Sequence, residues 1–150
     1  MRRSIDELRT FYGEPTGALV RRVLARRLDD AMNARLAEHG LTLQQFAILM
    51  TVIEHGRMTQ AEIGRLFAMP AYAISRAIDG LEADGLLVRD AHPSSRRAHQ
   101  IHATEKALDM APAMFAIVKA VNADLTQGLG DKEAGELRRL LATVVETAAI

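Results

Sequence analysis

The sequence predicts a mainly α-helical fold with one small β-hairpin, and two patterns carry this prediction. Apolar residues recur at spacings of three and four along most of the chain, which is the period of an amphipathic helix. Two short extended runs flank a polar turn around residues 90–97, which is typical of a hairpin. The chain has 150 residues, 49% of them hydrophobic, so we expect one domain over residues 1–150.

Two helices are predicted in the first forty residues. Residues 4–12 have the pattern of a short capped helix. Residues 16–39 form a long amphipathic pattern that stops at Gly40, a residue type that commonly ends helices. The apolar positions of this long helix are Leu19, Val20, Val23, Leu24, Leu28, Met32 and Leu36.

The central segment predicts two short helices separated by a turn. Thr59 and Glu62 have the spacing of a capping box, which indicates a helix from Thr59 to Phe67. Pro70 breaks the pattern and suits the first turn of a new helix. Phe46, Phe67 and Phe115 are expected in the core that supports this arrangement.

The second short helix has one packing face and one free face. Ile74, Ile78 and Leu81 share the apolar face. A helix that enters the major groove of DNA contacts base edges with its N-terminal residues. If this is such a helix, the candidate contact residues are Ala71, Tyr72, Ala73, Ser75 and Arg76, with Arg76 suited to guanine.

A hairpin is predicted after this helix ends at Asp84-Gly85. Its strands are residues 86–89 and 98–102, and its polar turn runs from Asp90 to Arg97. A basic hairpin beside a reading helix can follow the DNA backbone and place an arginine in the minor groove. The candidate residues are Ser94, Arg96 and Arg97. Residues 41–103 are therefore interpreted as a winged helix-turn-helix lobe.

Two more amphipathic helices are predicted at residues 104–128 and 131–149, with Pro112 expected to kink the first. Their apolar stripes exceed what so small a lobe can cover. Packing against a second copy would bury them in a two-fold interface. We therefore expect residues 4–39 and 104–149 to form dimerisation helices, which suits a palindromic operator whose half-sites lie about one DNA turn apart.

The order of these motifs resembles the MarR family of regulators. The resemblance covers nearly the whole chain, and it implies a homodimeric, ligand-responsive, DNA-binding protein whose effectors are phenolic or other aromatic anions. Two positions depart from the family pattern: Ser95 replaces the usual wing aspartate, and Ala107 replaces a frequent glycine. The matching positions are Leu41-Thr42, Gln45, Glu62, Ser75-Arg76, Leu81-Glu82, Gly85-Leu86, Arg89, Pro93, Arg96-Arg97 and Thr104-Glu105.

Composition bears on which kinds of site and partner the chain could have. The chain has no cysteine. Its 19 basic side chains balance 19 acidic ones, so its overall charge does not favour binding of nucleic acid. His99 and His102 would point to opposite faces of a strand, so we expect no metal site. We expect no cofactor either. No catalytic motif is present, and we predict that the protein is not an enzyme.

The sequence thus favours a cytoplasmic transcriptional regulator, acting as a ligand-responsive repressor dimer on double-stranded DNA. An effector pocket is placed at Leu19, Val23, Met50 and Phe115. The alternative is a winged-helix module that binds a protein or sequesters a ligand without binding DNA, which the neutral charge and Ser95 motivate. Steep salt dependence of DNA binding separates the two hypotheses.

Overall fold

The structure is a computed structural model that describes residues 15–92 and 95–147, with the side chains of residues 22–91 and 99–147. Six helices, one 3-10 turn and three strands are assigned within these residues. In chain order they are α2 (Pro15–Leu36), η1 (Ala37–His39), α3 (Leu43–His55), β1 (Met58–Thr59), α4 (Gln60–Phe67), α5 (Ala71–Ala83), β2 (Leu87–His92), β3 (Ser95–Ala103), α6 (Glu105–Thr126) and α7 (Asp131–Thr147).

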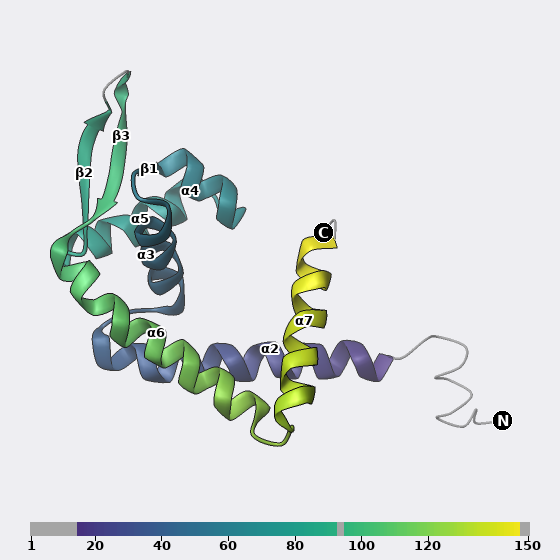
Figure 1. Cartoon of the computed structure of the whole chain (residues 1–150). Helices are drawn as coiled ribbons and strands as arrows, with labels where there is room; N and C mark the ends of the chain where they lie inside the picture. The colour runs from purple at the N-terminus through teal and green to yellow at the C-terminus, as the bar shows by residue number, and fades with distance from the viewer. Residues whose placement is uncertain (1–14, 93–94, 148–150) are drawn as a thin grey trace.

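The elements form a lobe and a set of flanking helices (Figure 1). Helices α3, α4 and α5 lie together beside the sheet, and the β2–β3 hairpin projects beyond them. Helices α2 and α6 contact each other below this lobe, and α7 turns back from the end of α6 to stand apart from the lobe. The predicted fold class, a winged helix-turn-helix flanked by helices, is confirmed.

The sheet is antiparallel, with strand order β1-β3-β2. Arg89 is paired with Ile101, and Met58 of β1 lies on the other side of the same Ile101. The predicted hairpin is therefore present, but the predicted turn over residues 90–97 was too long, because the strands continue to His92 and resume at Ser95. The register shifts between Ala91 and His92.

One core joins the lobe to the flanking helices. It includes Ile48 and Val52 of α3, Ile78 of α5 and Met114 of α6, all shielded from solvent. Phe46 and Phe67 pack partly buried against this core, as predicted. Phe115 does not, because the buried face of α6 carries Ala107, Ala111, Met114, Ile117 and Val121, which leaves Phe115 61% exposed.

Local signals explain where the central helices begin and end. Both hydrogen bonds of the capping box between Thr59 and Glu62 are present at the start of α4. Pro70 is the N-cap of α5, in an extended conformation that a helix interior would not allow. Gly40 follows η1 in the left-handed conformation, with φ of 69°. The predicted helix over residues 4–12 lies outside the described residues.

None of the described helices is long and apolar enough to cross a membrane.

Ala68 ends α4 in the left-handed conformation, with φ of 48°, and it is the only described residue other than glycine with a positive φ. A side chain makes this conformation costly, so Ala68→Gly should raise the free energy of unfolding by about 0.5–1 kcal/mol. Urea denaturation at fixed protein concentration measures the change. Ala61→Gly, inside the same helix, is the control and should lower stability. Equal losses in both variants would contradict the interpretation.

Candidate nucleic-acid interface

Helix α5 presents one face to the core and the other to solvent. Its buried residues are Ile74, Ala77, Ile78 and Leu81. Among the predicted contact residues, Ala71, Tyr72 and Arg76 are exposed or half-buried on the free side, with Tyr72 71% exposed. Ala73 and Ser75 also belong to the first half of the helix. The structure therefore places all five predicted residues in the first half of α5, outside its buried face.

The start of α5 is held by backbone and side-chain contacts from the elements before it. The Nε2 of Gln60 donates to the carbonyl of Ala71 at 3.3 Å, which ties α4 to the first turn of α5. The carbonyl of Pro70 accepts from Ala73 N at 3.0 Å and from Ile74 N at 3.3 Å. The N-cap residue Pro70 makes no side-chain hydrogen bond to this N-terminus. The first amide groups of a helix can bind an anion such as a DNA phosphate where no side chain caps them.

The middle of α5 passes close to α3. A Cβ built on Gly80 would lie 2.7 Å from Nε2 of Gln45. Gln45 has a second role, because its Oε1 accepts from the backbone N of Thr42 at 3.0 Å and closes the capping box of α3. The absence of a side chain at Gly80 therefore leaves room for the Gln45 side chain that caps α3.

The wing is joined to α5 by an arginine that binds two carboxylates. Arg89 of β2 donates through Nη2 to Oδ1 of Asp79 at 2.6 Å and through Nη1 to Oε2 of Glu82. The backbone N of Arg89 also donates to Oε1 of Glu82 at 3.3 Å. The side chain of Arg89 is only 21% exposed. Spacing along the sequence does not reveal this bridge, because Arg89 lies on a different element from Asp79 and Glu82.

A second charged group lies on the hairpin, next to β1. Asp90 accepts from Nη1 of Arg57 at 2.9 Å, and its Oδ2 lies 3.3 Å from Nδ1 of His102. That ring nitrogen is shielded from solvent and makes no aligned hydrogen bond. Together these residues connect the strand β2 to β3 and to the residue that precedes β1.

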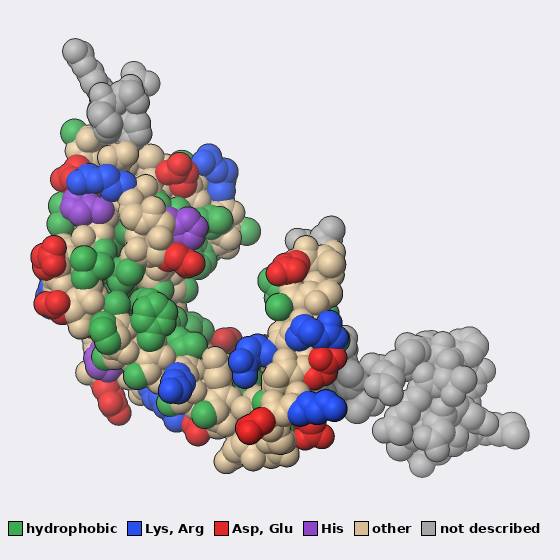
Figure 2. Space-filling view, viewed as in Figure 1, with side chains coloured by type: hydrophobic (Ala, Val, Ile, Leu, Met, Phe, Trp, Pro, Cys, Tyr) green, Lys and Arg blue, Asp and Glu red, His purple; other side chains and the backbone are tan. Residues whose placement is uncertain are grey.

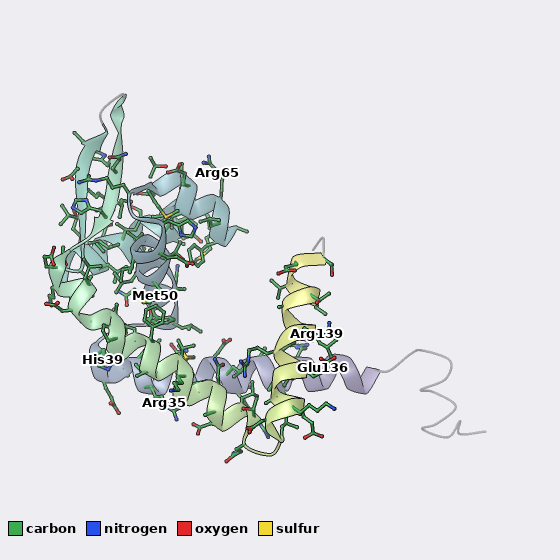
Figure 3. All side chains as sticks on the ribbon, in the orientation of Figure 1. Arg35, His39, Met50, Arg65, Glu136 and Arg139 are labelled. Carbon is green, nitrogen blue, oxygen red and sulfur yellow. The ribbon has the colours of Figure 1, made fainter. Side chains whose placement is uncertain are left out.

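These contacts decide which charges remain free on the lobe. Arg57 and Arg89 are committed to carboxylates, whereas Arg76 has no ion-pair partner within the described residues. Basic and acidic side chains lie side by side on the visible face of the lobe (Figure 2). Arg65 points outward from α4 (Figure 3). Within the described part of α5, Arg76 is therefore the cation that remains available to a ligand.

Two of the three predicted wing residues, Arg96 and Arg97, belong to β3, and their side chains are outside the described ones. Ser94 is outside the described residues altogether. Their predicted contacts with DNA stay predictions.

The predicted effector residues lie on three helices. Leu19 and Val23 belong to α2, Met50 to α3 and Phe115 to α6. Val23 is 41% exposed, Met50 is half-buried in α3 (Figure 3), and the side chain of Leu19 is outside the described ones. Phe115 lines a hollow of about 680 Å³ between α6 and α7, together with Lys119. A common pocket for the four residues stays a prediction.

Another hollow, of about 670 Å³, lies between the wing and the helix-turn-helix. It is lined by residues from α4, from the turn before α5 and from the hairpin, including Arg65, Met69, Arg89 and His99.

The described residues contain no cluster of three or more histidine or carboxylate side chains that could bind a metal ion.

The arrangement of α4, the turn at Ala68, α5 and the projecting hairpin defines a winged helix-turn-helix protein. Residues 39–98 match the sequence model of the MarR family. The regulator MhqR of Bacillus subtilis (strain 168) is 31% identical over 90 residues, which are 60% of this chain and 62% of MhqR. YkoM of the same organism is 29% identical over 104 residues, 69% of this chain and 68% of YkoM. This chain therefore resembles MarR-family proteins over its winged helix-turn-helix lobe, and it spans less than two thirds of the length of MhqR.

Solved structures have the same fold over more of the chain. SlyA is 28% identical, with a TM-score of 0.73, over 85% of this chain and 92% of SlyA. Apo MarR from E. coli is 23% identical, with a TM-score of 0.77, over 87% of this chain and 96% of that one. A mutant of E. coli MarR in complex with operator DNA has a TM-score of 0.75 at 23% identity, over 87% of this chain and 94% of that one. The flanking helices are therefore part of the shared fold.

Gly80→Ala tests whether the Gln45 side chain lies as close to Gly80 as described. The added methyl group would displace Gln45 from its cap or push the helices apart, so we expect a loss of about 1 kcal/mol in the free energy of unfolding. Gly135→Ala is the matched control, because Gly135 lies within α7 with open space around it, and it should gain stability. A neutral Gly80→Ala would show that the helices tolerate the extra volume.

Proposed function

We propose that this chain is a transcriptional regulator that binds double-stranded DNA by placing α5 in the major groove and the β2–β3 hairpin along the neighbouring backbone. The observation that carries the proposal is the first half of α5. There Tyr72 is exposed, Arg76 lacks an ion-pair partner within the described chain, and the N-cap residue Pro70 makes no capping hydrogen bond. Base edges are read in this way by helices of this class.

The function includes a homodimer, and the surface of α7 supports it. None of the described residues of α7 is buried, although Leu140, Leu141, Val144 and Val145 form an apolar stripe on it. The other side of α7 is polar, and there Arg139 forms two hydrogen bonds with Glu136, which lower the pKa of that carboxyl. A helix with one apolar face needs a partner, and a second copy would present two α5 helices to a palindromic site.

The finer proposal is a repressor whose DNA affinity changes when a small aromatic or phenolic anion binds. Its support is the match of residues 39–98 to the MarR family model, together with two hollows that border the reading lobe and the flanking helices. The matched relatives are named as regulators, and MhqR is matched over less than two thirds of its length, so this role is a proposal for this chain.

Selection of the purified protein against random duplex DNA tests the proposal. We expect enrichment of a palindrome whose half-sites lie about one helical turn apart, because a two-fold dimer presents its reading helices on one side of the duplex. Absence of any enriched sequence would contradict it. The protein would then be better described as a winged-helix interaction module.

Arg76→Ala should weaken binding to the selected site by about 1–3 kcal/mol and relax the preference for one base pair in each half-site. The reason is the loss of a guanidinium able to bind guanine with two hydrogen bonds. Quantitative binding to all single-base variants of the site measures both effects. The fold should be unaffected, since Arg76 is not buried and has no ion-pair partner among the described residues. An unchanged base preference would reject this role.

Val144→Lys should disrupt the dimer, because it places a charge in the apolar stripe of α7, where Val144 is 58% exposed in the single chain. Light scattering coupled to size-exclusion chromatography measures the mass in solution. Thr143→Lys is the control, because Thr143 lies outside the stripe on the same helix, and it should leave the mass unchanged. Identical masses for the wild type and Val144→Lys would place the interface elsewhere.

A further inference from the structure

We call the exposed line of Tyr72, Arg76 and Asp79 on α5 the reading stripe. The negative charge of Asp79 on this stripe opposes the proposed binding of DNA. Tyr72, Arg76 and Asp79 are spaced four and three residues apart, and none of them is buried. Residues at these spacings lie one above the other on a helix surface. A free carboxylate at this position would repel DNA phosphates. It would also stand within reach of Arg76, with which it has the i,i+3 spacing of a helix ion pair.

The structure resolves this conflict through Arg89. The guanidinium of Arg89 binds Oδ1 of Asp79 at 2.6 Å, so the Asp79 carboxylate is directed toward the hairpin. Arg76 correspondingly has no ion pair within the described residues. The position of Arg89 along the sheet is fixed, because it is paired with the fully buried Ile101 of β3.

Glu82 secures Arg89 in this position. It accepts from the Nη1 and from the backbone N of Arg89, so the guanidinium is anchored on one side and presents Nη2 to Asp79 on the other. Only 21% of the Arg89 side chain is exposed, compared with 58% of Asp79. A side chain that is mostly buried between two carboxylates is poorly placed to contact a phosphate itself.

We propose that Arg89 is a positioning residue, which holds Asp79 away from Arg76 and thereby keeps Arg76 available to read a base pair. Removal of Arg89 leaves Asp79 with Arg76 as its nearest cation along the stripe. The reading residue is then lost to an intrahelical pair although it is still present in the sequence. This inference rests on the proposed function, because it concerns the contact that Arg76 makes with DNA.

Binding of the selected DNA site and its single-base variants tests the inference. Arg89→Gln should weaken binding by about tenfold and relax the same base preference as Arg76→Ala. Asp79→Asn combined with Arg89→Gln should restore that preference, because an amide does not capture Arg76. Glu82→Gln combined with Arg89→Gln is the matched control, and it should not restore the preference, since Asp79 stays charged. Arg89→Lys should keep the preference by keeping a cation at Asp79.

A different role for Arg89 would give a different pattern of results. A direct phosphate contact by Arg89 would reduce the slope of log affinity against log salt by about one in Arg89→Gln, with no rescue by Asp79→Asn. A purely structural role would lower stability and affinity for all sites alike, without a specific loss at the position read by Arg76. Either result would overturn the inference.

A measurement without DNA separates this inference from the proposed function. Hydrogen exchange of the Arg76 side-chain Nε–H, followed by NMR, reports whether Arg76 is paired. We expect slower exchange in Arg89→Gln than in the wild type, and a return to the wild-type rate in the variant that also carries Asp79→Asn. Asp79→Asn alone should change nothing. A change in Asp79→Asn alone would mean that Asp79 already binds Arg76, and it would overturn the inference even if the protein binds DNA.

Discussion

The burial of one face of α5 is the constraint on which the rest of the interface depends. Ile74, Ile78 and Leu81 are fully shielded, and each contributes about 1.5–3 kcal/mol to folding by leaving water. An exposed ion pair contributes only about 0–1 kcal/mol. The apolar face therefore decides how α5 is rotated on the lobe. Once this rotation is fixed, the helical period alone sends Tyr72 and Arg76 to the free side.

Charge placement then adapts this surface to its proposed partner. A chain with no net charge gains no general attraction to DNA, so the local arrangement must supply it. Three carboxylates near the reading face are engaged within the protein: Asp79 and Glu82 by Arg89, and Asp90 by Arg57. The wing is connected to the lobe by the same contacts. The same side chains therefore neutralise the acidic groups and hold the hairpin in position.

The elements marked by strong local signals were predictable from the sequence. The capping box at Thr59 and the break at Pro70 located α4 and α5, and the stop at Gly40 located the end of the first long helical segment. The two-residue strand β1 was not predicted, since it exists only through its pairing with β3. Helix α3 was not delimited either, because its apolar residues lie on several sides and give no clear period.

The candidate site was predictable only in part, for a related reason. The position of Arg76 on the free face follows from spacing within one helix. The role of Arg89 does not, because its partners lie on a different element and the hairpin must fold back before they meet. Phe115 shows the same limit: it lies in an apolar helix, and only the three-dimensional packing reveals that Met114 and Ile117 take the buried side.

Titration of the purified protein with its selected duplex at two salt concentrations tests the central claim, that this lobe reads DNA, most directly. Neutralised phosphates release counterions, so affinity should fall by at least about a hundredfold between about 50 and 200 mM salt, as expected for several phosphate contacts. An affinity that does not change with salt, or no binding at either concentration, would contradict the claim and favour a winged-helix module that recognises a different partner.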